Sequence, residues 1–233
     1  MALRAQPFVH ALWLEGADAA GRADAYSDLD LWADVDAGSE GWVFACIRAA
    51  LLTLGPLEVE HDASHPHPQL EQRFYRVAGT SPFLFVDVCL QQHGRETVFA
   101  PHDPFKLLFD RSGVVRTGEE VMDEAFVVQA ARSVEAAWWR RVLVLKEVAR
   151  GRPLEALAYY HSEVLEPLTR LLRLRFCPAK HDYGLKHLYA DLPGEATAEL
   201  EVLYAVVTLA DLPAAVRRAD EHFKDTFAVL RDG

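Results

Sequence analysis

The sequence has few cysteines, no long apolar run and too few positive charges to balance the negative ones. The three cysteines, Cys46, Cys89 and Cys177, are odd in number and far apart, which indicates neither a disulfide framework nor a cysteine-based zinc site. No charge-free apolar stretch approaches the roughly 20 residues that cross a bilayer, and the first residues lack the apolar core of a signal peptide. We therefore expect a cytoplasmic protein without a membrane partner.

Basic residues are outnumbered, because 24 Lys and Arg face 35 Asp and Glu and give a formal charge of −11. Such a balance argues against a nucleic-acid partner and is compatible with a cationic substrate or a bound metal ion. Hydrophobic residues make up 51% of the 233 positions, which is enough for a packed core and too many for a disordered chain.

The two halves of the chain differ in their hydrophobic patterns. Short apolar runs separated by turns predict strands over residues 8–14, 29–35, 57–61, 73–78 and 83–90, and helical spacing predicts a helix over residues 39–54. From Thr117 onward the spacing is helical, and Thr117 with Glu120 forms a capping box. The predicted fold class is α+β: a small mixed β-sheet with helices over residues 1–112, followed by an all-α helical bundle over residues 113–233.

One predicted strand carries an unusual row of acids. In the run from Leu29 to Val35 the side chains alternate, so Asp28, Asp30, Asp34 and Asp36 share one face with Trp32. Like charges on neighbouring same-face positions repel, and a divalent cation with oxygen ligands would remove the repulsion. The simpler interpretation, which we adopt for Asp34 and Asp36, is that these two lie beyond the strand in solvent.

Another acid, Asp87, interrupts the apolar run from Phe83 to Leu90. A lone carboxylate is costly to bury among such residues, unless it lies at a sheet edge or caps a turn. If this run lies beside the strand over residues 29–35, Asp87 joins Asp28 and Asp30 in a three-carboxylate cluster. Such a cluster can hold one or two magnesium ions against a triphosphate.

These acids also form part of a longer pattern. Trp13-Leu-Glu-Gly16-Ala17, a spacer of about ten residues, and Asp28-Leu-Asp30-Leu together resemble the signature of the nucleotidyltransferase (DNA polymerase beta-like) superfamily. The spacer contains Gly21, Asp24 and Ser27 at the Gly-x-x-Asp-x-x-Ser-Asp spacing, which resembles the bacterial antibiotic (aminoglycoside or lincosamide) branch. The resemblance covers roughly residues 8–90, and the helical half is similar in kind only.

The resemblance implies transfer of a nucleoside monophosphate from ATP or another nucleoside triphosphate to a hydroxyl of a small molecule, with antibiotic resistance as a setting. Asp28, Asp30 and Asp87 would bind Mg²⁺. Asp87, or an acid of the helical half such as Glu163 or Glu166, would act as the general base. For the two glutamates, the alternative is that they are solvated helix charges.

Further residues would contact the nucleotide: Gly16, Ala17, Arg22, Ser27 and Lys186, with Lys180 as a second basic residue. Ala17 departs from the family pattern, which has Ser or Gly there. Its backbone N–H can still meet a phosphate, but it has no hydroxyl, and Ser27 or Arg22 would have to compensate.

Two other functions remain open. The chain could be a non-catalytic nucleotide-binding or regulatory module of the same fold, which Ala17 favours. It could also be a protein-modifying nucleotidyltransferase of the antitoxin type, although those are typically single short domains. The resemblance leaves homodimer formation open and predicts a site between the two domains.

Overall fold

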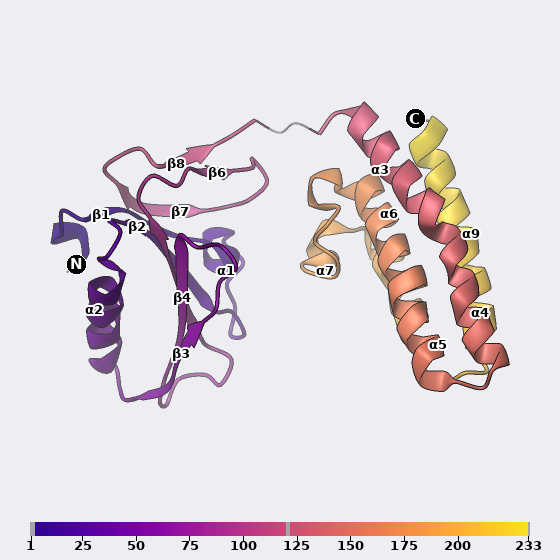
Figure 1. The fold of residues 1–233 in the computed structure, drawn as a ribbon, viewed down its shortest axis with the longest axis horizontal. Coiled ribbons are helices and arrows are strands. Elements are labelled where there is room, and N and C mark those ends of the chain that lie inside the picture. Colours follow the sequence, from indigo (N-terminus) through magenta and orange to yellow (C-terminus); the bar gives the residue numbers. More distant parts are fainter. Residues whose placement is uncertain (1–2, 120–121, 233) are drawn as a thin grey trace. The chain divides into compact units, whose positions relative to one another are not determined.

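The computed structural model (Figure 1) describes residues 3–119 and 122–232. The chain divides into two compact units, residues 1–120 (unit 1) and residues 121–233 (unit 2), and each is described by itself. In the described ranges no helix is both long and apolar enough to cross a bilayer.

Unit 1 is built on a six-stranded mixed sheet with the strand order β3-β4-β5-β2-β1-β7. The central pair, β2 and β5, is parallel, whereas the other neighbours are antiparallel, and β6 and β8 form a separate parallel pair. The elements are η1 (Leu3–Ala5), β1 (Val9–Leu14), α1 (Gly16–Ala19), β2 (Leu29–Val35), α2 (Glu40–Leu52), β3 (Leu57–Ala63), β4 (Leu70–Val77), β5 (Val86–Gln92), β6 (Thr97–Phe99), β7 (Lys106–Asp110) and β8 (Val115–Thr117).

The core of unit 1 lies between α2 and one face of this sheet. Val43, Phe44 and Ile47 recur at helical spacing, are buried, and pack with strand residues such as Ala33 and Val88. Figure 1 shows α2 lying against one side of the sheet. Because side chains alternate along a strand, the even-numbered residues of β2 point to the opposite face, which is where the acids lie.

The regular elements in the described residues of unit 2 are all helices. Its core joins all the longer helices and includes the stacked rings of Trp138 and Phe223, whose centroids are 3.9 Å apart. The elements are α3 (Glu124–Ala137), η2 (Trp138–Arg141), α4 (Val142–Ala149), α5 (Pro153–Tyr160), the π-helical turn η3 (His161–Leu165), α6 (Glu166–Phe176), η4 (Pro178–Lys180), α7 (Leu188–Asp191), α8 (Gly194–Tyr204) and α9 (Leu212–Asp232).

The predicted α+β fold class is confirmed: a mixed sheet with helices is followed by a helical part. All five predicted strands and the helix near residues 39–54 are present, with ends that shift by a few residues.

The predicted capping box at Thr117 is wrong. Thr117 ends β8 and pairs with Phe99, and its predicted partner Glu120 lies outside the described residues. The helix begins instead at Glu124, where the side chain of Asp123 accepts a hydrogen bond from the backbone N–H of Phe126. Strand β8 lies within unit 1, beyond the boundary predicted at residues 112 and 113.

Candidate functional site

The sheet topology brings two of the predicted metal ligands together. Strands β2 and β5 are parallel neighbours, and in their register Asp30 is the direct partner of Asp87. Strand β5 is an interior strand, since β4 flanks it on its other side. Asp87 therefore does not lie at a sheet edge, and it shares one face of the sheet with Asp30.

Asp28 precedes β2 and links the beginnings of the two strands. Its Oδ1 accepts a hydrogen bond of 2.9 Å from the backbone N–H of Phe85, just before β5. Leu29 N–H in turn donates to the carbonyl of Phe85. These contacts fix Asp28 beside the start of β5, close to Asp87.

The three carboxylates influence one another electrostatically. Burial is the largest cause that raises the pKa of Asp87, and the negative charges of Asp30 and Asp28 raise this pKa further. The side-chain amide of Gln72, on the neighbouring strand β4, opposes the rise by donating to Asp87 at 2.8 Å. Gln72 therefore orients Asp87, a role that the sequence pattern did not indicate.

Gly16 permits the turn after β1 to approach Asp30. Its φ is +66°, and a Cβ on this residue would lie 1.9 Å from Oδ2 of Asp30. The backbone N–H of Glu15 donates to the carbonyl of Asp30 at 3.0 Å, which holds the turn against β2. A side chain at this position would displace the Asp30 carboxylate and would be strained at this φ, so both effects favour glycine.

Ser27 and Asp24 close the turn that leads into β2. The Ser27 hydroxyl donates to Oδ1 of Asp24 and accepts the backbone N–H of Asp24, both at 2.9 Å. The pKa of Asp24 is lowered, first by the N–H of Tyr26 and then by Ser27. Arg22 is exposed, and its backbone N–H donates to the carbonyl of Ala17. The Gly-x-x-Asp-x-x-Ser spacing thus has a structural reason, since it forms a closed turn.

Other polar groups on the same face were not predicted from the sequence. Glu15 precedes Gly16, and its carboxylate accepts a 2.9 Å hydrogen bond from Nε1 of Trp13. Burial, followed by the charges of Asp87 and Glu15, raises the pKa of Cys89 to about 12. The only sequence signal for Glu15 and Cys89 was their place beside Gly16 and Asp87.

The donor set of the three aspartates suits a hard cation. It consists of carboxylate oxygens, which Mg²⁺ prefers, and the pKa of Asp87 is raised first by burial and then by the charges of Asp30 and Asp28. Among the described residues, the group with three donor atoms within 4.8 Å of one another is His10, Asp34 and His93. The cluster of Asp28, Asp30 and Asp87 is more widely spaced than this. Magnesium in nucleotide sites usually keeps several waters and binds one or two carboxylates together with substrate phosphates, so the closer spacing is not required.

The prediction that Asp34 lies in solvent is wrong, whereas Asp36 is exposed as predicted. Asp34 is inside β2 and 0% exposed, and its Oδ2 accepts a 2.7 Å hydrogen bond from Nε2 of Gln91. The reason is that the side chains of Gln91 on β5 and His93 after β5 contact the Asp34 carboxylate in place of water.

The predicted residues of the helical half lie in unit 2, where each has a distinct environment. Glu163 belongs to the π-helical turn and forms an ion pair of 2.8 Å with Arg140, and its side chain is 11% exposed. Glu166 begins α6 and lines a cavity of about 570 Å³ with Thr169 and Tyr204. A role for Glu163 or Glu166 in a site shared with unit 1 stays a prediction.

The two lysines also differ. Nζ of Lys180 lies 2.8 Å from Oδ1 of Asp191, so its ammonium group forms an ion pair within unit 2. Lys186 is exposed, and its carbonyl accepts a hydrogen bond from buried Arg173. Contact of Lys186 with nucleotide phosphates stays a prediction.

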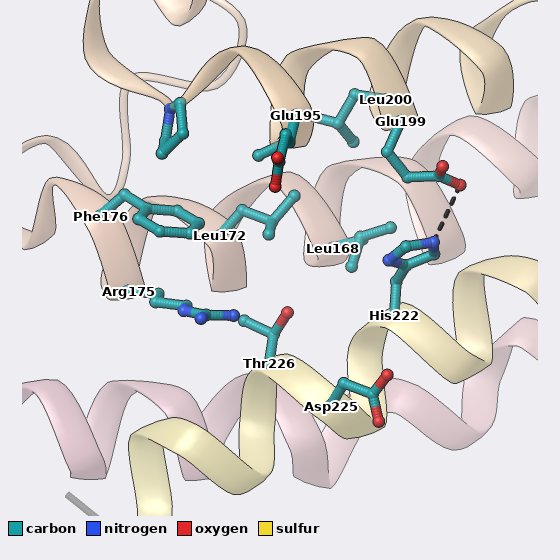
Figure 2. A pocket seen from close by; sticks show the side chains of 12 residues that line it. Leu168, Leu172, Arg175, Phe176, Glu195, Glu199, Leu200, His222, Asp225 and Thr226 are labelled. Carbon is teal, nitrogen blue, oxygen red and sulfur yellow. Dashed lines mark ion pairs between the residues drawn. The ribbon is translucent and has the colours of Figure 1, made fainter.

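A second cavity of about 470 Å³ lies between α6, α8 and α9 of unit 2 (Figure 2). Leucines such as Leu168 and Leu200 line it together with carboxylates, of which Glu199 pairs with His222 at 2.9 Å. Arg218 also pairs with Glu199, which lowers the pKa of that carboxyl. These contacts are structural links between α8 and α9.

No protein-family profile and no curated protein matches the chain. Among solved structures, it is similar to an aminoglycoside 6-adenyltransferase from Bacillus subtilis, with a TM-score of 0.44 and 12% identity. The match covers 99% of this chain and 86% of that chain. At this TM-score the likeness carries no inference about activity, which has to rest on the site itself.

Proposed function

We propose that this protein is a magnesium-dependent nucleotidyltransferase that moves a nucleoside monophosphate from a nucleoside triphosphate to a hydroxyl of a small molecule. The observation that carries the proposal is the pairing of Asp30 with Asp87 on parallel neighbouring strands. Asp28 adjoins this pair, and Gly16 holds the preceding turn against Asp30. These are the positions of the motif identified in the sequence.

In this proposal Asp28, Asp30 and Asp87 would hold Mg²⁺, which when bound neutralises phosphate charge. The acceptor oxygen forms a bond to the α-phosphorus, the bond to the β-phosphate oxygen breaks, and pyrophosphate leaves. The acceptor's hydroxyl proton passes to a carboxylate, for which Asp87 is the candidate in unit 1 and Glu163 the candidate in unit 2. The N–H groups of Gly16 and Ala17 lie in the turn beside Asp30, where they can donate to phosphate oxygens.

For the acceptor we propose a basic small molecule of the aminoglycoside kind. The support is the formal charge of −11, which attracts cationic molecules and repels polyanions. Phosphates are negatively charged as well, so the nucleotide requires the metal ion to offset this repulsion.

Transfer is tested by incubating the full chain with Mg²⁺, each of the four labelled ribonucleoside triphosphates, and a panel of aminoglycosides and lincosamides. We expect pyrophosphate release together with a labelled product. Asp30→Asn and Asp87→Asn should each lower the rate by about 100-fold or more. Glu96→Gln, at an exposed acid that pairs with Arg116 on the surface, is the matched control and should retain the rate. Transfer to none of the compounds would contradict the proposed acceptor class.

A non-catalytic nucleotide-binding module is the second candidate, and two observations favour it. Ala17 has no hydroxyl, and the Ser27 hydroxyl that could replace it is already hydrogen-bonded to Asp24. Such a module would bind a magnesium–triphosphate complex without releasing pyrophosphate, whether small molecules or proteins are offered as acceptors. A labelled protein in place of a labelled small molecule would instead indicate a protein-modifying enzyme.

A further inference from the structure

Two histidines and two aspartates gather at the end of β2 that lies away from Asp30. Asp34 is near the end of β2, His10 is on β1, and His93 follows β5 directly. A nitrogen of each histidine and a carboxylate oxygen of Asp34 all lie within 4.8 Å of one another. Asp36 adds a further carboxylate, because its Oδ1 lies 2.8 Å from Nε2 of His10.

We propose that His10, Asp34 and His93, with Asp36 beside His10, form a binding site for a divalent transition-metal ion of the zinc type. Imidazole nitrogens combined with carboxylate oxygens are a ligand set typical of zinc, whereas magnesium prefers oxygen alone. The site is thus distinct in chemistry from the cluster of Asp28, Asp30 and Asp87. It is also distinct in place, since the four-residue step from Asp30 to Asp34 spans about 13 Å along a strand.

The backbone holds these side chains in position. His93 N–H donates to the carbonyl of Val35 at 2.7 Å, and Asp36 N–H donates to the carbonyl of Phe8 at 3.0 Å. The carbonyl of His10 accepts from the N–H of Arg111 at 2.8 Å. Because these ligands come from three adjoining strands and their ends, one ion would join β1, β2 and β5.

Hydrogen bonds from neighbouring residues orient the side chains of the proposed ligands. Gln91 donates to Oδ2 of Asp34, while Oδ1 of Asp34 lies 2.6 Å from Nδ1 of His93. The hydroxyl of Ser112 lies 3.1 Å from Nδ1 of His10, which leaves Nε2 on the side of Asp36. Groups of this kind fix the ring orientation and tautomer of a ligating histidine.

Charge supplies the reason for an ion at this place. Asp34 and Asp36 are two carboxylates that lie beside His93 and His10, and the Asp34 side chain is fully buried. The His10 and His93 rings are stacked with centroids 3.7 Å apart, which places both imidazoles next to these carboxylates. A single divalent ion balances both carboxylates.

The test is a calorimetric titration of the chelator-treated full chain with zinc chloride, together with the melting temperature with and without zinc. We expect one strongly bound equivalent and a higher melting temperature. His10→Gln and His93→Gln keep a hydrogen-bond donor toward Asp36 and Asp34, so they should fold, and each should lower zinc affinity by at least about tenfold.

Two controls separate this site from other metal-binding groups. His65→Gln combined with His67→Gln removes two histidines of the loop before β4 and should leave zinc affinity unchanged. Asp30→Asn should likewise leave it unchanged. Absence of zinc binding to the unaltered chain would overturn the proposal, and so would undiminished affinity in both His10→Gln and His93→Gln. Undiminished affinity in both histidine variants would identify the cluster as a structural ion pair between Asp34 and His93.

Discussion

Gly16 is the residue on which the candidate nucleotide site depends most directly. Its left-handed backbone and the missing Cβ allow the turn after β1 to lie against the Asp30 carboxylate. Gly21, in the same segment, has nearly the same φ of +65° but no atom within 4 Å of the position that a Cβ would take. The two glycines therefore separate the effect of backbone strain from the effect of close approach.

We predict that Gly16→Ala and Gly21→Ala each lower the free energy of unfolding by about 1–2 kcal/mol, because alanine is strained at positive φ. Only Gly16→Ala should also abolish magnesium-dependent nucleotide binding, because its Cβ displaces Asp30. Urea unfolding and nucleotide titration measure the two effects. Equal nucleotide affinity in both variants would show that nucleotide binding does not depend on the present position of the Asp30 carboxylate.

Asp34 shows why some residues of the candidate sites could not be predicted from the sequence. The alternation from Leu29 to Val35 correctly predicted a strand with the acids on one face. However, the groups that bury and bind Asp34 are Gln91 and His93, which are 57 and 59 residues away along the chain. Whether a carboxylate at a strand end is exposed to water or hydrogen-bonded to protein groups depends on residues that are far away in the sequence.

Among the elements, α6 of unit 2 supports the segment that follows it through one buried arginine. Arg173 is 0% exposed, donates to the carbonyls of Gly184 and Lys186, and forms a 3.0 Å ion pair with Asp191. This segment contains Lys186, the predicted phosphate contact. The position of Lys186 thus depends on a side chain that makes no predicted contact with substrate.

We predict that Arg173→Met lowers the free energy of unfolding of unit 2 by about 3 kcal/mol, because a buried ion pair and its hydrogen bonds are lost. Arg170→Gln is the matched control on the same helix, since Arg170 is exposed, and it should change stability by less than about 0.5 kcal/mol. Urea unfolding followed by the helical circular dichroism signal measures both. Similar stability of the two variants would contradict the role of Arg173.

The ion pairs of Asp191 with Lys180 and Arg173 predict that the stability of the fold depends on pH. Burial raises the pKa of Asp191, but hydrogen bonds from Lys180 and Arg173 lower it by more, so the folded-state pKa lies below the usual 3.8. A depressed carboxylate pKa stabilises the fold above the unfolded pKa, and this stabilisation is lost as the pH falls through the folded pKa. The chain should therefore exceed Asp191→Asn in stability at pH 7, and the difference should shrink between about pH 5 and about pH 3. A constant difference would contradict the assignment.

Element prediction succeeded where hydrophobic spacing was strong and missed the short strands β6, β7 and β8. The alternation in β2 and the helical spacing near residues 39–54 were visible in the sequence. Strand β7 has only five residues, Lys106–Asp110, and lies at the sheet edge, so it shows little alternation. Thr117 matched a helix cap locally but pairs with Phe99 instead, because strand pairing outweighs a local capping preference.

At the scale of the molecule, each unit has its own hydrophobic core, and the candidate nucleotide site is carried by unit 1. The three aspartates, Gly16 and Gln72 all belong to this unit. The predicted site between the two domains, with Glu163 or Lys186 taking part, remains a prediction. The order of the elements from β1 to β5 followed from the sequence pattern, whereas the direct pairing of Asp30 with Asp87 required the strand register.

The net charge predicts how the whole molecule responds to polyanions. With a formal charge of −11, the chain should not shift duplex DNA or RNA in a gel at about 0.1 M salt, where screening still leaves long-range repulsion. Binding at that ionic strength would indicate a basic surface that the overall charge conceals, and it would contradict the expected absence of a nucleic-acid partner.

The most direct test of the central claim is calorimetric titration of the full chain with each ribonucleoside triphosphate, with and without Mg²⁺. We predict that at least one triphosphate binds in the presence of Mg²⁺ only. Asp30→Asn should lower this affinity by at least about tenfold, and Glu96→Gln should preserve it. Absence of binding, or binding that neither Mg²⁺ nor Asp30→Asn alters, would contradict the claim that Asp28, Asp30 and Asp87 form a magnesium–nucleotide site.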